Sequence, residues 1–78
     1  MKLCPEHVAG ARGMLKMSQA ELAAEAGISA RTVINFENGA SELRPETELA
    51  LIAVLERRGI RFQNGGQPTV TLIDPKRV

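Results

Sequence analysis

Apolar residues recur at helical spacing over most of this chain and change to the alternation of β-strands near its end. This pattern predicts four helices, at about 5–15, 18–26, 30–38 and 45–58, and two strands, at 60–63 and 69–72. Residues 64–68, NGGQP, have the composition of a turn, so the two strands are expected to pair as a β-hairpin. The expected fold class is mainly α, with four helices and a C-terminal β-hairpin.

The second predicted helix and the turn after it have well-defined ends. Ser18 and Glu21 have the spacing of a capping box, in which each side chain accepts a hydrogen bond from the other residue's amide. Gly27 can take the left-handed backbone conformation, which costs most other residues roughly 1 kcal/mol, so the helix is expected to end there. Ser29 is expected to cap the next helix. Two helices joined in this way predict a helix-turn-helix, whose second helix enters the DNA major groove.

The third predicted helix has one polar and one apolar face. With Arg31 at zero and about 100° per residue, Asn35 lies near 40° and Asn38 near −20°, whereas Val33 and Phe36 lie near 200° and 140°. Arginine can donate two hydrogen bonds to guanine, and asparagine can both donate to and accept from adenine. On an isolated helix these residues would usually be no more than solvated surface. The capping box, the glycine turn and the preceding helix favour the DNA-binding interpretation instead.

Ile34 falls near −60° on the same helix, beside the polar face. An apolar side chain there could contact the methyl group of a thymine or pack against the first helix of the domain. Of these two interpretations the sequence slightly favours packing.

The chain resembles the Cro and phage-repressor (XRE-type) family of helix-turn-helix DNA-binding domains over roughly residues 5–59, about two thirds of its length. The resemblance rests on this set of residues, spaced across three helices: Arg12, Leu15, Ser18, Gln19, Glu21, Leu22, Ala23, Gly27, Ser29, Thr32, Val33, Phe36, Glu37 and Gly39. It implies a four-helix repressor-like domain that binds double-stranded DNA.

The same resemblance implies contacts with DNA at seven residues: Gln19, Ala30, Arg31, Thr32, Asn35, Asn38 and Arg44. Gln19 and Asn38 would hold backbone phosphates. Base edges would face Ala30, Arg31 and Asn35. Thr32 could serve either purpose, and Arg44, in the loop before the fourth helix, could lie along the backbone or in the minor groove.

Arg12 and Glu37 have a different role in the resembling family, where an ion pair joins the first helix to the end of the recognition helix. A partly buried charge that loses its partner costs several kcal/mol, so this pair is expected to support folding rather than recognition.

The fourth predicted helix carries seven consecutive apolar residues at 49–55, more than the core of one small domain is expected to cover. We expect the chain's own tail or a second copy of the chain to cover the remainder. The hypothesis is a homodimer formed through these residues: Leu51, Leu55, Ile60, Phe62, Val70 and Leu72. Residues 1–59 would then be the DNA-binding part, and residues 60–78, a hairpin and tail where the family usually has a further helix, would be a dimerisation element of the same domain. The alternative is a monomer whose hairpin folds back on its own helix.

Composition limits the other classes of function. The formal net charge is only +1, which counts against nucleic-acid binding unless the charge is unevenly placed, and it predicts modest affinity per subunit. One histidine, one cysteine and no glycine-rich phosphate loop leave no nucleophile with a base at motif spacing, so neither an enzyme nor a cofactor is expected. Cys4 and His7 form C-x-x-H, but a structural zinc site needs four ligands, so no metal is expected.

No apolar run approaches the roughly 20 residues that span a bilayer, and the N-terminus lacks the apolar segment of a signal peptide, so a cytoplasmic location without membrane contact is expected. The sequence therefore predicts a sequence-specific DNA-binding transcriptional regulator, in particular a repressor that inserts the 30–38 helix as a homodimer. The alternative is an antitoxin or adaptor that binds a protein partner, with or without DNA.

Overall fold

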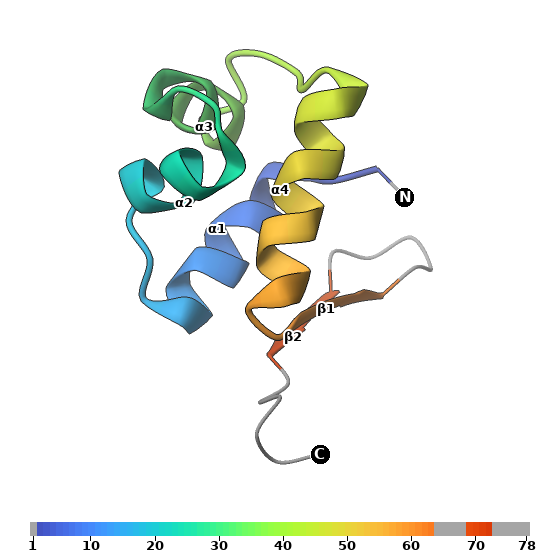
Figure 1. Ribbon diagram of the computed structural model, residues 1–78. Coiled ribbons are helices and arrows are strands. Elements are labelled where there is room, and N and C mark those ends of the chain that lie inside the picture. Colours follow the sequence, from blue (N-terminus) through green and yellow to red (C-terminus); the bar gives the residue numbers. More distant parts are fainter. Residues whose placement is uncertain (1, 64–68, 73–78) are drawn as a thin grey trace.

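Four helices and a two-stranded antiparallel sheet follow one another along the chain, as the sequence predicts (Figure 1). The computed structural model describes residues 2–63 and 69–72. The elements are α1 (Pro5–Leu15), α2 (Gln19–Ala26), α3 (Ala30–Glu37), α4 (Pro45–Arg57), β1 (Ile60–Gln63) and β2 (Thr69–Leu72).

The ends of α2 and α3 agree with the predicted caps. The Ser18 hydroxyl accepts from the Glu21 amide at 3.0 Å, and the Glu21 carboxylate accepts from the Ser18 amide at 2.8 Å. Gly27 ends α2 with φ at 73°, a conformation that glycine adopts at little cost. Ser29 then accepts from the Thr32 amide at 3.2 Å and begins α3. Local sequence therefore sets the angle at which α3 leaves α2.

The first helix, α1, begins with a cap formed by Cys4 and His7, which lie three positions apart. The Cys4 amide donates to Nδ1 of His7 at 3.0 Å, and Pro5 occupies the first turn, where its missing N–H costs nothing. Gly10 and Gly13 lie in α1, and among the described residues no atom lies within 4 Å of where a Cβ would stand, so neither glycine is needed for a close helix contact.

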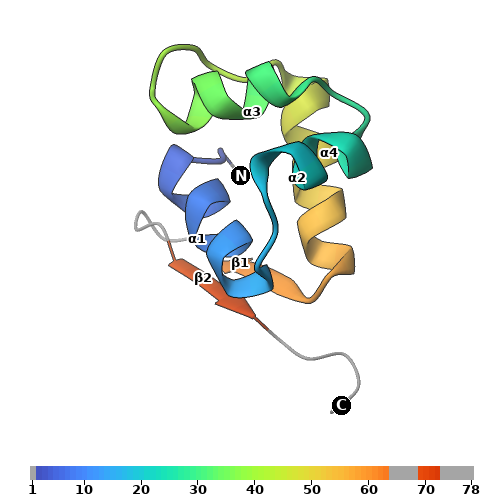
Figure 2. The same cartoon turned by 90° about the vertical axis from the view of Figure 1, so that its left-hand side faces the viewer.

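One hydrophobic core joins all four helices to the first strand. Its buried members are Leu3, Val8, Ala11, Met17, Leu22, Ala23, Val33, Phe36, Leu51, Val54, Leu55 and Ile60. α3 and the hairpin lie at opposite ends of the molecule in both views (Figures 1 and 2). The core therefore holds α3 at one end of the domain while the strands cover the other.

The burial of three residues in α4 and β1 contradicts part of the predicted dimer interface. Leu51 and Leu55 are 0% exposed and Ile60 is 3% exposed, because all three pack inside the core of their own chain. The prediction that these three residues contact a second copy is therefore wrong. Leu49, by contrast, is 67% exposed on the opposite side of the helix.

The hairpin forms with Ile60 opposite Leu72 and Phe62 opposite Val70. Phe62 is half-buried and meets the ring of His7 edge-on, with ring centroids 5.6 Å apart, which joins β1 to α1. The predicted turn, Asn64–Pro68, lies outside the described residues, as do residues 73–78 of the predicted tail.

Candidate nucleic-acid interface

The two faces of α3 are separated as its periodicity predicts. Val33 is 0% exposed and Phe36 is 6% exposed, so both anchor the helix in the core. On the other side, Arg31 and Asn38 are exposed and Asn35 is half-buried. Arg31 therefore lies exposed on the outward face, and half-buried Asn35 lies one turn further along the same helix.

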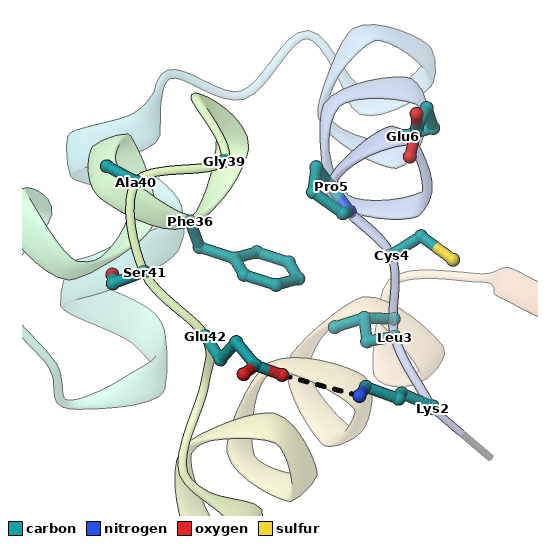
Figure 3. A pocket seen from close by; sticks show the side chains of 10 residues that line it. All are labelled: Lys2, Leu3, Cys4, Pro5, Glu6, Phe36, Gly39, Ala40, Ser41 and Glu42. Atoms are coloured by element: carbon teal, nitrogen blue, oxygen red, sulfur yellow. Dashed lines mark hydrogen bonds and ion pairs between the residues drawn. The ribbon is translucent and has the colours of Figure 1, made fainter.

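The Phe36 side chain fixes the C-terminal half of α3 from behind. Its ring points from α3 toward Leu3 and Pro5 across a cavity of about 640 Å³ between the start of the chain and the loop after α3 (Figure 3). At the rim of this cavity, Lys2 Nζ lies 3.4 Å from a carboxylate oxygen of Glu42, and both side chains are exposed. Phe36 and Leu3 belong to the same hydrophobic core, which joins α3 to the N-terminal segment.

Three of the predicted DNA-binding residues line a single groove beside α3. Thr32, Asn35 and Arg44 line a cavity of about 420 Å³ between α3 and the start of α4. Arg44 is the exposed N-cap residue of α4 and lines this groove together with Thr32 and Asn35 of α3. Glu42 and Glu46 line the groove as well, which lowers its positive potential.

Gln19 makes a contact that the sequence did not reveal. Its Nε2 donates to Glu37 at 3.1 Å, which links the first residue of α2 to the last residue of α3. A carboxamide nitrogen carries two hydrogens, and this bond uses one of them. The contact joins residues 18 positions apart, so no local spacing in the sequence indicates it.

The ion pair that the resemblance implies is present. Arg12 Nε and Nη2 each donate to the Glu37 carboxylate at 2.7 Å, and Arg12 Nη1 donates to the backbone oxygen of Met17 at 2.9 Å. The Arg12 side chain is 20% exposed and that of Glu37 is 7% exposed. The hydrogen bonds to Glu37 raise the pKa of Arg12 above its ordinary value. Glu37 is therefore fully occupied by neighbours and takes no part in the outward face.

Two further observations concern an ion pair between α4 and α2 and the position of Ala30, one of the residues predicted to face DNA bases. Arg58 at the end of α4 forms an ion pair with Glu25 of α2, which lowers the pKa of Glu25 and raises that of Arg58. Ala30 is half-buried and packs against the core, so only part of its surface faces outward.

Within residues 2–63 and 69–72, no three histidine, cysteine, aspartate or glutamate side chains gather in a group that could hold a metal ion. Over the same part of the chain, no helix has both the length and the apolar character needed to cross a bilayer.

A family model described as helix-turn-helix matches residues 9–59, which include the whole of α2, the turn and α3. None of the curated proteins matches the chain.

Proposed function

Because this chain belongs to the Cro/C1-type helix-turn-helix family, whose members are DNA-binding regulators, we propose that it is a sequence-specific repressor that inserts α3 into the major groove as a homodimer. The proposal commits particular residues to base contacts and others to the phosphate backbone.

The observation that carries the proposal is the outward face of α3. Arg31 is exposed and lies one turn before Asn35, while Val33 and Phe36 hold the opposite face in the core. A guanidinium suits guanine O6 and N7, and a carboxamide suits adenine N6 and N7. In this proposal Arg31 and Asn35 therefore provide the sequence preference, and the half-buried Ala30 allows the start of α3 to approach the bases closely.

A second group of residues would position the domain without selecting a sequence. In this proposal Gln19 and Asn38, at the start of α2 and the end of α3, hydrogen-bond phosphates, and Arg44 adds a charge beside the groove that Thr32 lines. Acidic side chains share this surface, which is consistent with the net charge of +1. Because the electrostatic attraction is weak, we expect one subunit to bind modestly and two subunits to be needed.

The hairpin is the element that we propose for dimerisation. It lies at the end of the domain opposite α3 (Figures 1 and 2), so pairing of two hairpins across a two-fold axis leaves both recognition helices free. A two-stranded sheet has an outer edge on each strand, and such edges favour the addition of another strand. Residues 60–78 would then form one domain with residues 1–59, with Phe62 and the strands β1 and β2 at the interface. The buried Leu51, Leu55 and Ile60 are not part of this proposal.

The deciding experiment is selection of duplexes from a random pool, followed by binding of the preferred duplex to Arg31→Ala. The loss of a bidentate base contact is expected to cost about 1–3 kcal/mol and to relax the preference at one base pair of each half-site. Arg57→Ala is the matched control, because Arg57 is an exposed arginine in the last turn of α4, far from α3. Equal binding by the two variants would refute the proposed contact face.

The dimer has its own test in sedimentation of the free protein at tens of micromolar. A two-fold symmetric duplex among the selected sequences, with half-sites about 34 Å apart, would support the dimer independently. A monomer in solution and a single, asymmetric half-site would exclude it. In that case the free strand edges would be surfaces for a different protein.

A further inference from the structure

Ile34 is an apolar side chain on the outward side of α3 that the core does not use. It is half-buried, yet among the described residues it does not belong to the partly buried hydrophobic side chains that pack against the core. Ala30 and Ile28, which are also half-buried, do belong to that set. The sequence slightly favoured packing for Ile34, and its absence from this set counts against that interpretation.

The neighbours of Ile34 place it on the surface that would meet DNA. It follows Arg31 by three residues and precedes Asn38 by four, so it lies one helical turn from each of these exposed polar side chains. A solvated or phosphate-binding surface would favour a polar residue at this position. The part of the isoleucine that remains exposed is apolar area that a binding partner would cover.

The major groove offers one apolar group to such a side chain, the C5 methyl of thymine. We propose that Ile34 contacts this methyl group and so requires a thymine at one position of each half-site, next to the base pair that Arg31 contacts. This inference rests on the proposed function, since it assumes that α3 enters the major groove. It adds a specificity-determining residue that acts by apolar contact and makes no hydrogen bond.

The test uses the duplex obtained by selection and replaces each thymine in turn by deoxyuridine, which lacks only the C5 methyl. With the parent protein, each half-site is expected to contain one sensitive thymine. Replacing that single thymine should weaken binding about fourfold, the change that corresponds to one buried methyl group. With Ile34→Ala, the same replacement should have almost no effect, while all other positions keep their parental values. Because each result is a ratio measured on one protein, a small change in the stability of the variant does not affect it.

Two controls complete the experiment. Ile52→Ala removes the same atoms from an isoleucine that packs against the core on α4, and it should retain the fourfold response to deoxyuridine. The second control compares a duplex with cytosine at the sensitive position and one with 5-methylcytosine there. The added methyl group should restore part of the binding to the parent but not to Ile34→Ala, because only the parent can contact it.

The inference is wrong if deoxyuridine is tolerated at every thymine, or if Ile34→Ala responds to it as the parent does. Either result, together with a loss of binding by Arg31→Ala, would refute the methyl contact and leave the proposed function standing. If Arg31→Ala binds the selected duplex as well as the parent does, the proposed contact face and the Ile34 contact are both wrong. Ile34 would then be assigned to an interface with another protein.

Discussion

Arg12 and Glu37 lie 25 positions apart in sequence, yet two parallel hydrogen bonds of 2.7 Å join their side chains and connect α1 to the last residue of α3. The carboxylate is almost fully covered, at 7% exposed, and it also accepts from Gln19. The recognition helix is therefore held at its C-terminal end by an ion pair and along its inner face by apolar contacts. This arrangement separates the residues that position α3 from those that would contact DNA.

Replacing Arg12 by methionine should destabilise the protein without changing which DNA sequence it prefers. The Glu37 carboxylate would stay buried with only Gln19 as a partner, and an uncompensated charge of this kind costs about 3 kcal/mol. Urea denaturation measures the loss as a lower midpoint at an unchanged slope. Sequence preference, measured at a temperature where the variant is folded, should equal that of the parent.

The matched control is Arg57→Met, which removes an exposed arginine of α4 and should change the free energy of unfolding by less than about 0.5 kcal/mol. The double variant Arg12→Met/Glu37→Leu should recover much of the lost stability, since no buried charge then remains. If the double variant is as unstable as Arg12→Met, an effect other than the unpaired carboxylate accounts for the loss.

Arg44 is expected to act on affinity and not on specificity. Arg44→Ala should weaken binding to selected and unrelated duplexes by a similar factor, and it should reduce the slope of log K against log salt by about one. Arg31→Ala, by comparison, should weaken the selected duplex far more than the unrelated one. Binding measured at several salt concentrations distinguishes the two variants. A normal slope for Arg44→Ala would place its guanidinium away from the phosphates.

The helix-turn-helix could be predicted almost completely because its signals are local. Ser18, Glu21, Gly27 and Ser29 form their caps with residues no more than a few positions away, so spacing alone determines them. The burial of Val33 and Phe36 also followed from periodicity within a single helix.

Contacts that depend on the relative placement of helices could not be predicted in this way. The Glu25–Arg58 ion pair and the hydrogen bond from the Leu3 amide to Glu48, at 2.7 Å, join residues 33 and 45 positions apart and have no local signature. The dimer prediction was wrong in part for a related reason. A run of seven apolar residues leaves no polar position to mark the outer face of a helix, so the sequence could not distinguish buried Leu51 from exposed Leu49.

The capping box of α2 should make stability depend on pH in the acid range. Hydrogen bonds from the Ser18 backbone and then its side chain lower the pKa of Glu21 in the folded protein. The stabilising effect is complete above the ordinary pKa of glutamate, roughly 4.3, and is lost as pH falls through the lower folded-state value. Glu21→Gln keeps an acceptor at this position but does not titrate, so the decline in stability below about pH 5 should be shallower than in the parent.

Urea midpoints between pH 3 and 7 measure this dependence. The same change at Glu56, an exposed residue whose carboxylate makes no hydrogen bond within the described part of the chain, is the control and should leave the decline unchanged. A parental decline in Glu21→Gln would mean that other carboxylates, such as Glu25 beside Arg58, account for the acid sensitivity.

Replacing Gly27 and Gly10 by alanine should change stability in opposite directions. Among the described residues, neither new side chain would meet a neighbouring atom. Gly27 has φ at 73°, so a Cβ there is strained by the backbone alone, and Gly27→Ala should destabilise the protein by about 1 kcal/mol. Gly10 lies inside α1 with open space around it, so Gly10→Ala should stabilise the protein by about 0.5–1 kcal/mol because alanine is the better helix former. Thermal unfolding of both variants measures the two signs. Stabilisation by Gly27→Ala would show that the turn between α2 and α3 does not need its left-handed residue, and the angle at which α3 is presented would then need another explanation.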